Sequence, residues 1–186
     1  MNNPSPSSGY SPEKPQQSKA GKYLTFVLAE EEYGLEILKV RQINGLMDIT
    51  AIPRMPTCIK GVINLHGKVI PVIDLRLKFG MEETPRTSET CIIVVHVKGV
   101  LMGIVVDRVS VVLELAAEDI EEPPSFGTTV NRDFILGMGK ANGSVKILLD
   151  IEKVLVDVEF TQVAGVATEA ETRRRTSQGQ RSRGLS

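Results

Sequence analysis

The sequence predicts an all-β protein of two small barrels, each of about five short strands, with short helical turns and a C-terminal helix. Three observations lead to this prediction: apolar segments typical of β-strands, glycine-containing turns between them, and an internal duplication. A sheet of five short strands avoids exposed edges best when it closes on itself, which favours barrels over open sheets.

Composition narrows the class of protein. The 186 residues are 41% apolar and 24% charged, the balance of an ordinary globular chain. The net charge is −1, but both ends are basic, so the part between them is acidic and disfavours a nucleic-acid partner. No secretory signal or membrane-length apolar run is present. We therefore expect a cytoplasmic protein in which Cys58 and Cys91 are reduced thiols.

Both ends of the chain are polar and lack apolar periodicity. We therefore expect a disordered N-terminal tail over residues 1–21 and a disordered, Arg-rich C-terminal tail over residues 161–186. The ordered part, residues 22–160, is predicted to divide into a first barrel at about 30–85 and a second at about 88–156. The first strand, 22–29, is a candidate member of the second barrel.

Turn and cap residues support the individual elements. Val- and Ile-rich segments flank Lys98-Gly99, which predicts a hairpin buried on both faces, and Asn142-Gly143 is a strong hairpin signal. The segments on either side of His66-Gly67 likewise predict a hairpin. Asp74 and Asp150 each precede a short apolar stretch, so they are predicted to cap a helical turn and a final helix.

The duplication is the most informative feature. At a shift of 76 residues (135 minus 59), segment 59–79 aligns without a gap on segment 135–155. At a shift of 69 (103 minus 34), Gly34 and Val40 align with Gly103 and Val109. The same order of elements therefore occurs twice, and we expect 59–79 and 135–155 to superpose. In the match between 59–79 and 135–155, five positions carry the same residue in both copies: Ile59, Gly61, Gly67, Val69 and Asp74 align with Ile135, Gly137, Gly143, Val145 and Asp150.

These residues resemble a known family. Segment 59–76, IKGVINLHGKVIPVIDLR, resembles the signature hairpin of CheW-like domains, I-x-G-V-x-N-L-R-G-x-x-x-P-V-x-D-L. Segment 33–40 resembles the part upstream of that hairpin, and segment 103–109 resembles the G-x-x-V-D-x-V strand of the family's second half. The resemblance runs in matching order from about Lys22 to Leu155. It implies two five-stranded, SH3-like barrels around a shared apolar core.

The resemblance also implies a function. Proteins of this kind are non-enzymatic adapters that couple the cytoplasmic tip of a methyl-accepting chemoreceptor to a CheA-type histidine kinase in chemotaxis, a two-component signalling system. By the same resemblance, the receptor would be bound around Val40, Gln42, Asn64 and His66, and the kinase near Ile104, Val106 and Val109. The protein would then reach the membrane through the receptor, without inserting into the bilayer.

Two positions depart from the family pattern. Many relatives have Glu and Arg where this chain has Gln42 and His66. An amide and a neutral imidazole each offer a donor and an acceptor, so we expect the two side chains to touch through a hydrogen bond.

Catalytic and metal-binding patterns are lacking. His66 and His96 are the only histidines, and the two solitary cysteines have no zinc-site spacing. Gly137-Met138-Gly139 lacks the Lys-Ser/Thr pair of a phosphate-binding loop. We therefore expect no enzyme activity, no cofactor and no metal. The alternative function is a small β-barrel nucleic-acid-binding module, which the absence of Trp disfavours.

Overall fold

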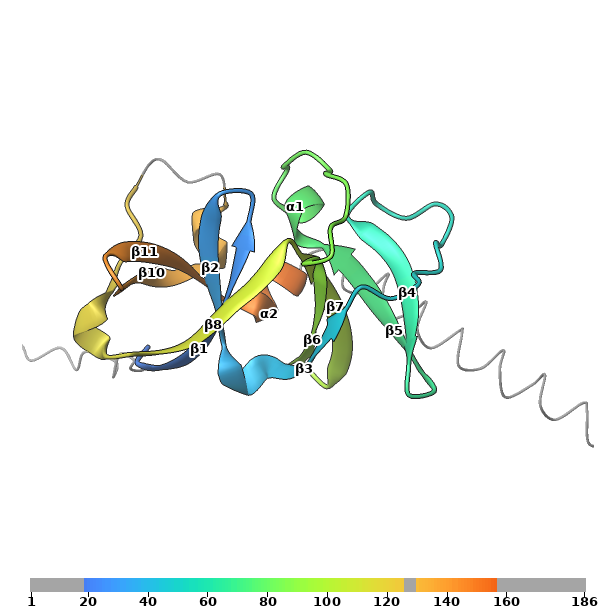
Figure 1. The fold of residues 1–186 in the computed structure, drawn as a ribbon. Helices are drawn as coiled ribbons and strands as arrows, with labels where there is room; N and C mark the ends of the chain where they lie inside the picture. Colours follow the sequence, from blue (N-terminus) through green and yellow to red (C-terminus); the bar gives the residue numbers. More distant parts are fainter. Residues whose placement is uncertain (1–18, 126–129, 157–186) are drawn as a thin grey trace, which may run out of the picture.

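The computed structural model describes residues 19–125 and 130–156, and in this part of the chain strands dominate (Figure 1). One sheet has six strands in the order β8-β1-β2-β11-β10-β9, and the other has five in the order β3-β6-β7-β5-β4. The predicted all-β class, with two small SH3-like β units, is confirmed. Apart from residues 19–21, the predicted tails lie outside the described residues.

The strands are short, and the helical elements are single turns or little more. The strands are β1 (Gly21–Leu28), β2 (Glu31–Glu36), β3 (Val40–Gly45), β4 (Ile59–Leu65), β5 (Lys68–Asp74), β6 (Cys91–Val97), β7 (Val100–Val106), β8 (Arg108–Leu115), β9 (Ile120–Glu121), β10 (Ile135–Ala141) and β11 (Ser144–Leu149). The helical elements are η1 (Ile37–Lys39), α1 (Leu75–Lys78), η2 (Ala117–Asp119), η3 (Arg132–Phe134) and α2 (Ile151–Leu155).

The chain divides between the two sheets differently from the sequence prediction. The N-terminal hairpin β1–β2 belongs to the six-stranded sheet, and the hairpin β6–β7 belongs to the five-stranded sheet. The predicted boundaries 30–85 and 88–156 therefore do not coincide with the two sheets, and the first strand, a candidate member of the second barrel, pairs with β8 in the six-stranded sheet. Each hairpin pairs with the third strand of the other repeat, β1 with β8 and β6 with β3.

The two copies of the duplication have the same local structure. The β4–β5 and β10–β11 hairpins both carry a register shift at the first glycine, between Ile59 and Gly61 and between Ile135 and Gly137. Their second strands pair in parallel at equivalent positions, β5 with β7 and β11 with β2. The expected correspondence of 59–79 with 135–155 is thus present in element order and strand register.

Caps and turns predicted from the sequence are also present. The carboxylate of Asp74 accepts a hydrogen bond from the Leu77 N–H at 3.3 Å, and that of Asp150 accepts one from the Lys153 N–H at 3.2 Å. These contacts cap α1 and α2. The two turn residues have positive φ in all three predicted hairpins, as type I′ turns require: His66-Gly67, Lys98-Gly99 and Asn142-Gly143.

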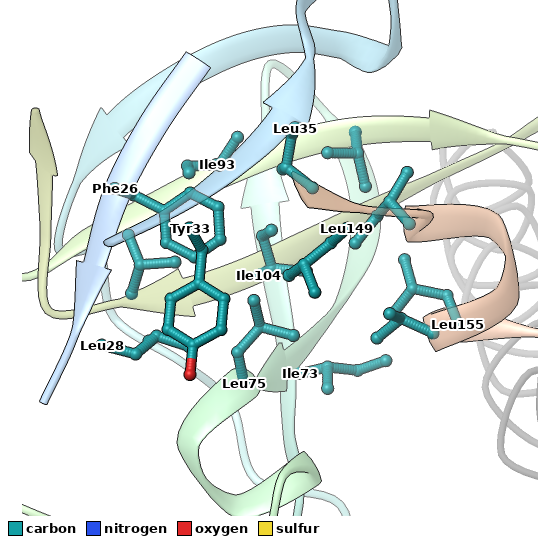
Figure 2. Close-up of a cluster of buried hydrophobic side chains, with 14 of the residues drawn as sticks. Phe26, Leu28, Tyr33, Leu35, Ile73, Leu75, Ile93, Ile104, Leu149 and Leu155 are labelled. Carbon is teal, nitrogen blue, oxygen red and sulfur yellow. The ribbon is translucent and has the colours of Figure 1, made fainter. Parts of the chain in front are cut away.

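A central apolar core lies between the two sheets, and each sheet also has a smaller core of its own. Figure 2 shows side chains of the central core, which come from both sheets and both helices. Strand β1 is buried on both faces, because Leu24, Phe26 and Leu28 enter the central core while Tyr23 enters the small core of the six-stranded sheet. The shared core implied by the resemblance is therefore present.

Candidate binding surfaces

The chain crosses between the two sheets at two points, and an ion pair holds each crossing. At the crossing from β7 to β8, Arg76 of α1 binds Asp107. Its Nε and Nη2 donate to the two carboxylate oxygens of Asp107, both at 2.7 Å. The second of these oxygens also accepts the backbone N–H of Ala29 at 2.8 Å. Asp107 therefore joins α1 to the β1–β2 turn, and the bidentate geometry makes this the strong form of an ion pair.

The other crossing, from β2 to β3, runs through η1. There Lys39 pairs with Glu152 of α2 at 2.5 Å between Nζ and Oε1. The hydrogen bond between them raises the pKa of Lys39 and lowers that of Glu152. Helix α1 follows β5 of the five-stranded sheet, and its Arg76 binds the point at which the chain leaves that sheet. Helix α2 follows β11 of the six-stranded sheet, and its Glu152 binds the point at which the chain leaves that sheet.

A groove of about 680 Å³ opens above the Arg76–Asp107 pair. Its walls are the β1–β2 turn, the start of β8 and the exposed loop between α1 and β6, which arches beside α1 in Figure 1. The charged lining residues are Arg76, Arg86, Arg108, Asp74, Asp107, Glu83 and Glu89. Because acids and bases are mixed here, the groove has no net attraction for a polyanion.

A buried charge lies in the six-stranded sheet. Lys146 of β11 is buried, and its ammonium group pairs with the carboxylate of Glu32 on β2. The hydroxyl of Ser110 on β8 donates to the same carboxylate at 3.3 Å. The Lys146 hydrogen bond is the main reason why the pKa of Glu32 lies below its usual value. This set of contacts stabilises the fold and presents no free charge to a ligand.

Each sheet has an edge strand with exposed apolar side chains. These strands are β3 in the five-stranded sheet and β8 in the six-stranded sheet, and the duplication aligns them with each other. Ile43 of β3 is 44% exposed and Val112 of β8 is 52% exposed, and the two occupy equivalent positions (112 minus 69 is 43). An unpaired strand edge with outward apolar side chains is a common protein-binding surface.

The predicted receptor-contact residues lie on two elements. Val40 and Gln42 are half-buried on β3, and Val40 packs against the central core. Asn64 and His66 are exposed at the β4–β5 turn, where the Asn64 side chain accepts the Gly67 N–H at 3.0 Å. Strands β3 and β4 are opposite edges of their sheet. Across the described part of the chain, no hydrogen bond joins Gln42 to His66, so the expected pairing is not seen there.

The predicted kinase-contact residues are mostly internal. Ile104 and Val106 are 0% exposed and belong to the central core, because β7 is an inner strand of its sheet. A partner cannot touch these two side chains in the folded protein, so their prediction as contact residues is corrected. Val109 of β8 is half-buried and packs against the same core, so it can be reached only in part.

Residues 22–159 match the family model of the CheW-like domain. The chain belongs to this family. Over 145 residues it is 43% identical to a chemotaxis protein CheW from Klebsiella aerogenes, a match that covers 78% of this chain and 87% of that protein. It is 31% identical to a chemotaxis protein CheW from Treponema pallidum, covering 77% of this chain and 86% of the relative.

Solved structures give the same family. The fold is similar to that of the scaffolding protein TtCheW from Thermoanaerobacter tengcongensis, with a TM-score of 0.69 and 37% identity. That match covers 73% of this chain and 92% of the other. The CheW-like signature hairpin is therefore β4–β5, and the G-x-x-V-D-x-V segment is the end of β7 with the crossing to β8.

Sequence reasoning missed the most accessible apolar residues. Leu38 of η1 is 84% exposed, and Ile43, Val111 and Val112 are about half exposed. In the segment 40–45 the residues at even positions are half-buried and those at odd positions are exposed. The sequence of this segment, VRQING, does not alternate apolar and polar residues, so its outer face was not visible before the structure.

Side chains that could bind a metal ion do not cluster within 19–125 and 130–156. In these two segments, no group of three or more His, Cys, Asp or Glu side chains is placed to hold a metal ion. The helices of these segments are too short and polar to cross a membrane.

Proposed function

We propose that this CheW-like protein is a non-enzymatic adapter in chemotaxis that binds the cytoplasmic tip of a methyl-accepting chemoreceptor and a CheA-type histidine kinase. The observation that carries the proposal is the pair of equivalent edge strands, β3 and β8, on two different sheets. An adapter needs two separate docking surfaces on one rigid body, and the shared central core makes the two sheets one body. Membership of the CheW-like family supports the same function.

The receptor surface is assigned to the five-stranded sheet. Its proposed contact residues are Val40, Gln42 and the exposed Ile43 on β3 and, at the opposite edge of the sheet, Asn64 and His66 near the β4–β5 turn. A helical receptor segment would suit this surface, because an exposed apolar side chain between polar ones can pack against the flank of an amphipathic helix. Gln42 and His66 stand where many relatives have Glu and Arg, so this surface selects a receptor different from the usual one.

The kinase surface is assigned to the outer side of β8. In this surface Val109 is half-buried, whereas Val111 and Val112 are exposed. Ile104 and Val106 contribute indirectly. They anchor β7 in the central core, and the chain continues from β7 into β8. Small apolar side chains on an open strand edge favour strand-to-strand or side-chain packing with another β-domain.

The adapter acts in the cytoplasm and meets the membrane only through the receptor. It supplies no chemistry of its own, so its effect on phosphorylation comes entirely from holding the kinase against the receptor. We expect no nucleotide hydrolysis by the purified protein.

Binding with purified partners tests the function. The protein is titrated with a CheA-type kinase and with a receptor-tip fragment, separately and together, and kinase autophosphorylation is followed. We expect binding of each alone, a ternary complex, and a change in kinase output only when all three are present. If the unaltered protein bound neither partner, the proposed adapter function would be contradicted.

Matched variants test the two surfaces. Val112→Asp is expected to weaken kinase binding at least tenfold and leave receptor binding unchanged, whereas Ile43→Asp should do the reverse. The control is Val145→Asp, because Val145 is 50% exposed but lies on β11, which is inside its sheet. Thermal unfolding of each variant shows whether the fold is intact. Equal losses for Val112→Asp and the control would contradict the surface assignment while leaving the function standing.

A further inference from the structure

The two repeats of the chain exchange their first hairpins. Here the first half means residues 21–79 and the second half means residues 91–155. Of the six-stranded sheet, β1 and β2 come from the first half and the other strands from the second. Of the five-stranded sheet, β6 and β7 come from the second half and the other strands from the first.

As a result, neither half contains a complete sheet of the folded protein. Within the first half, the strand ladders are the hairpins β1–β2 and β4–β5, and β3 finds its ladder partner in the second half. Within the second half, β6–β7 and the short set β9–β10–β11 remain, and β8 depends on β1. Isolated two-stranded hairpins are marginal in water, and the third strand of the β9–β10–β11 set, β9, has only two residues. We therefore expect neither half to fold alone.

The contacts between the halves are extensive. Four strand ladders join them: β1–β8, β2–β11, β3–β6 and β5–β7. Side-chain contacts follow the same division. The Thr25 hydroxyl donates to the Val111 carbonyl at 2.7 Å and accepts the Val111 N–H at 3.0 Å. Both ion pairs that hold the crossings, Arg76–Asp107 and Lys39–Glu152, also join one half to the other.

Charge favours pairing of unlike halves. In both crossing pairs the cation belongs to the first half and the anion to the second. The duplication aligns Arg76 with Glu152. If two first halves paired as the two unlike halves do, Arg76 of one copy would take the place of Glu152. It would then lie against Lys39 of the other copy. Like charges at a close contact disfavour that arrangement.

We infer that the protein is a tethered pair of halves, in which each half is the binding partner of the other and the loop over 80–90 is the tether between them. The surface that one half offers is therefore specific for the other half, from the same chain or from a second copy. Residues 82–89 of the tether are exposed, and the strand ladders do not include them.

Cutting the folded full-length chain tests the inference. A protease recognition site is inserted between Pro85 and Arg86, two residues with no hydrogen bond among those of the described chain. The uncut form of the same variant is the control. Should this insertion disturb folding, the site is moved between Ser88 and Glu89. After cleavage we expect both pieces to remain in one particle at micromolar concentration, and to unfold in a single transition whose midpoint rises with protein concentration.

The uncut control should unfold at a midpoint that does not depend on concentration. Pieces separated in urea should each lack β-structure by circular dichroism and regain it when mixed. Separation of the cut pieces with either piece still folded would overturn the inference, as would two independent transitions.

Exchange between copies tests the specificity. Cut protein in natural and ¹⁵N-labelled form is mixed, unfolded in urea and refolded, and native mass spectrometry records the pairs. We expect hybrids of a labelled first half with an unlabelled second half, in the proportion that random exchange of the pieces would give. Pairs of two first halves at a comparable level would overturn the specific pairing.

Discussion

Arg76 and Asp107 lie in different repeats of the sequence, yet their side chains form a bidentate ion pair at 2.7 Å beneath the groove. Arg76 follows the Asp74-Leu75 of the first signature segment, and Asp107 belongs to the G-x-x-V-D-x-V segment. Two motifs of the CheW-like family are therefore in contact, and the contact fixes the point at which the chain passes from one sheet to the other.

The Arg76–Asp107 pair should contribute measurably to stability. Arg76→Ala is expected to lower the free energy of unfolding by about 2 kcal/mol, because two charge-assisted hydrogen bonds are lost from a mostly buried site. Asp107→Ala should cost about 3 kcal/mol, since the Ala29 N–H loses its acceptor as well. Urea unfolding of both single variants and the double variant measures the coupling. Additive effects would show that the pair is not a direct interaction.

The first glycine of the signature hairpin should be irreplaceable. Gly61 has φ of +136°, and a Cβ there would lie 2.0 Å from the carbonyl oxygen of Thr50. Because that neighbour is backbone, Gly61→Ala is expected to cost more than about 3 kcal/mol or to prevent folding. Gly45→Ala is the control, since a Cβ there meets nothing within 4 Å. A Gly61→Ala variant as stable as the Gly45→Ala variant would contradict the close approach.

Acid should weaken the fold in part through Glu32. Lys146 holds the pKa of Glu32 below its usual value, so the unfolded chain takes up a proton before the folded one does. The stability from this group is complete above the unfolded pKa of about 4.3 and is lost as the pH falls through the lower folded value. Burial raises the pKa of Asp74, which acts in the opposite direction.

The Glu32 contribution is isolated by comparison of variants. Glu32→Gln should have a smaller loss of stability between pH 7 and pH 3 than the unaltered protein. The control is Glu114→Gln, an exposed carboxylate on β8. Urea midpoints at a series of pH values measure the effect. The same acid dependence in the Glu32→Gln variant and the unaltered protein would exclude this origin.

The hydroxyl of Tyr33 should be dispensable, although the ring is not. Its ring stacks on Phe26 and on Phe79 in the central core, and Figure 2 shows it beside Phe26. Within the described residues the Tyr33 hydroxyl has no hydrogen-bond partner. Tyr33→Phe is therefore expected to leave stability unchanged or raise it by about 1 kcal/mol. Tyr23→Phe is the contrast: the Tyr23 hydroxyl donates to the Lys19 carbonyl at 2.5 Å, and its loss should cost about 1 kcal/mol. Thermal unfolding ranks the two variants.

Local features of the fold were predictable from particular residues. Gly67, Gly99 and Gly143 mark turns because the second residue of a tight hairpin needs positive φ, which glycine adopts without strain. Asp74 and Asp150 mark helix starts because a carboxylate there accepts an otherwise unpaired N–H. These constraints act within a few residues of the chain, so the sequence expresses them directly. The alignment of Gly34 with Gly103 likewise predicted equivalent strands.

The pairing of those strands and their outward faces were decided only by the tertiary structure. The β1–β2 and β6–β7 hairpins are repeats of each other, and both lie inside a sheet: β1–β2 between β8 and β11, and β6–β7 between β3 and β5. Their local sequences therefore do not say which sheet each hairpin joins. For the same reason Ile104 and Ile43 look alike in the sequence, yet the inner strand β7 buries the first and the edge strand β3 exposes the second. The sequence by itself determined the strands, turns, caps and family of this protein, whereas the hairpin exchange and the accessible surface depend on contacts between residues far apart in the chain.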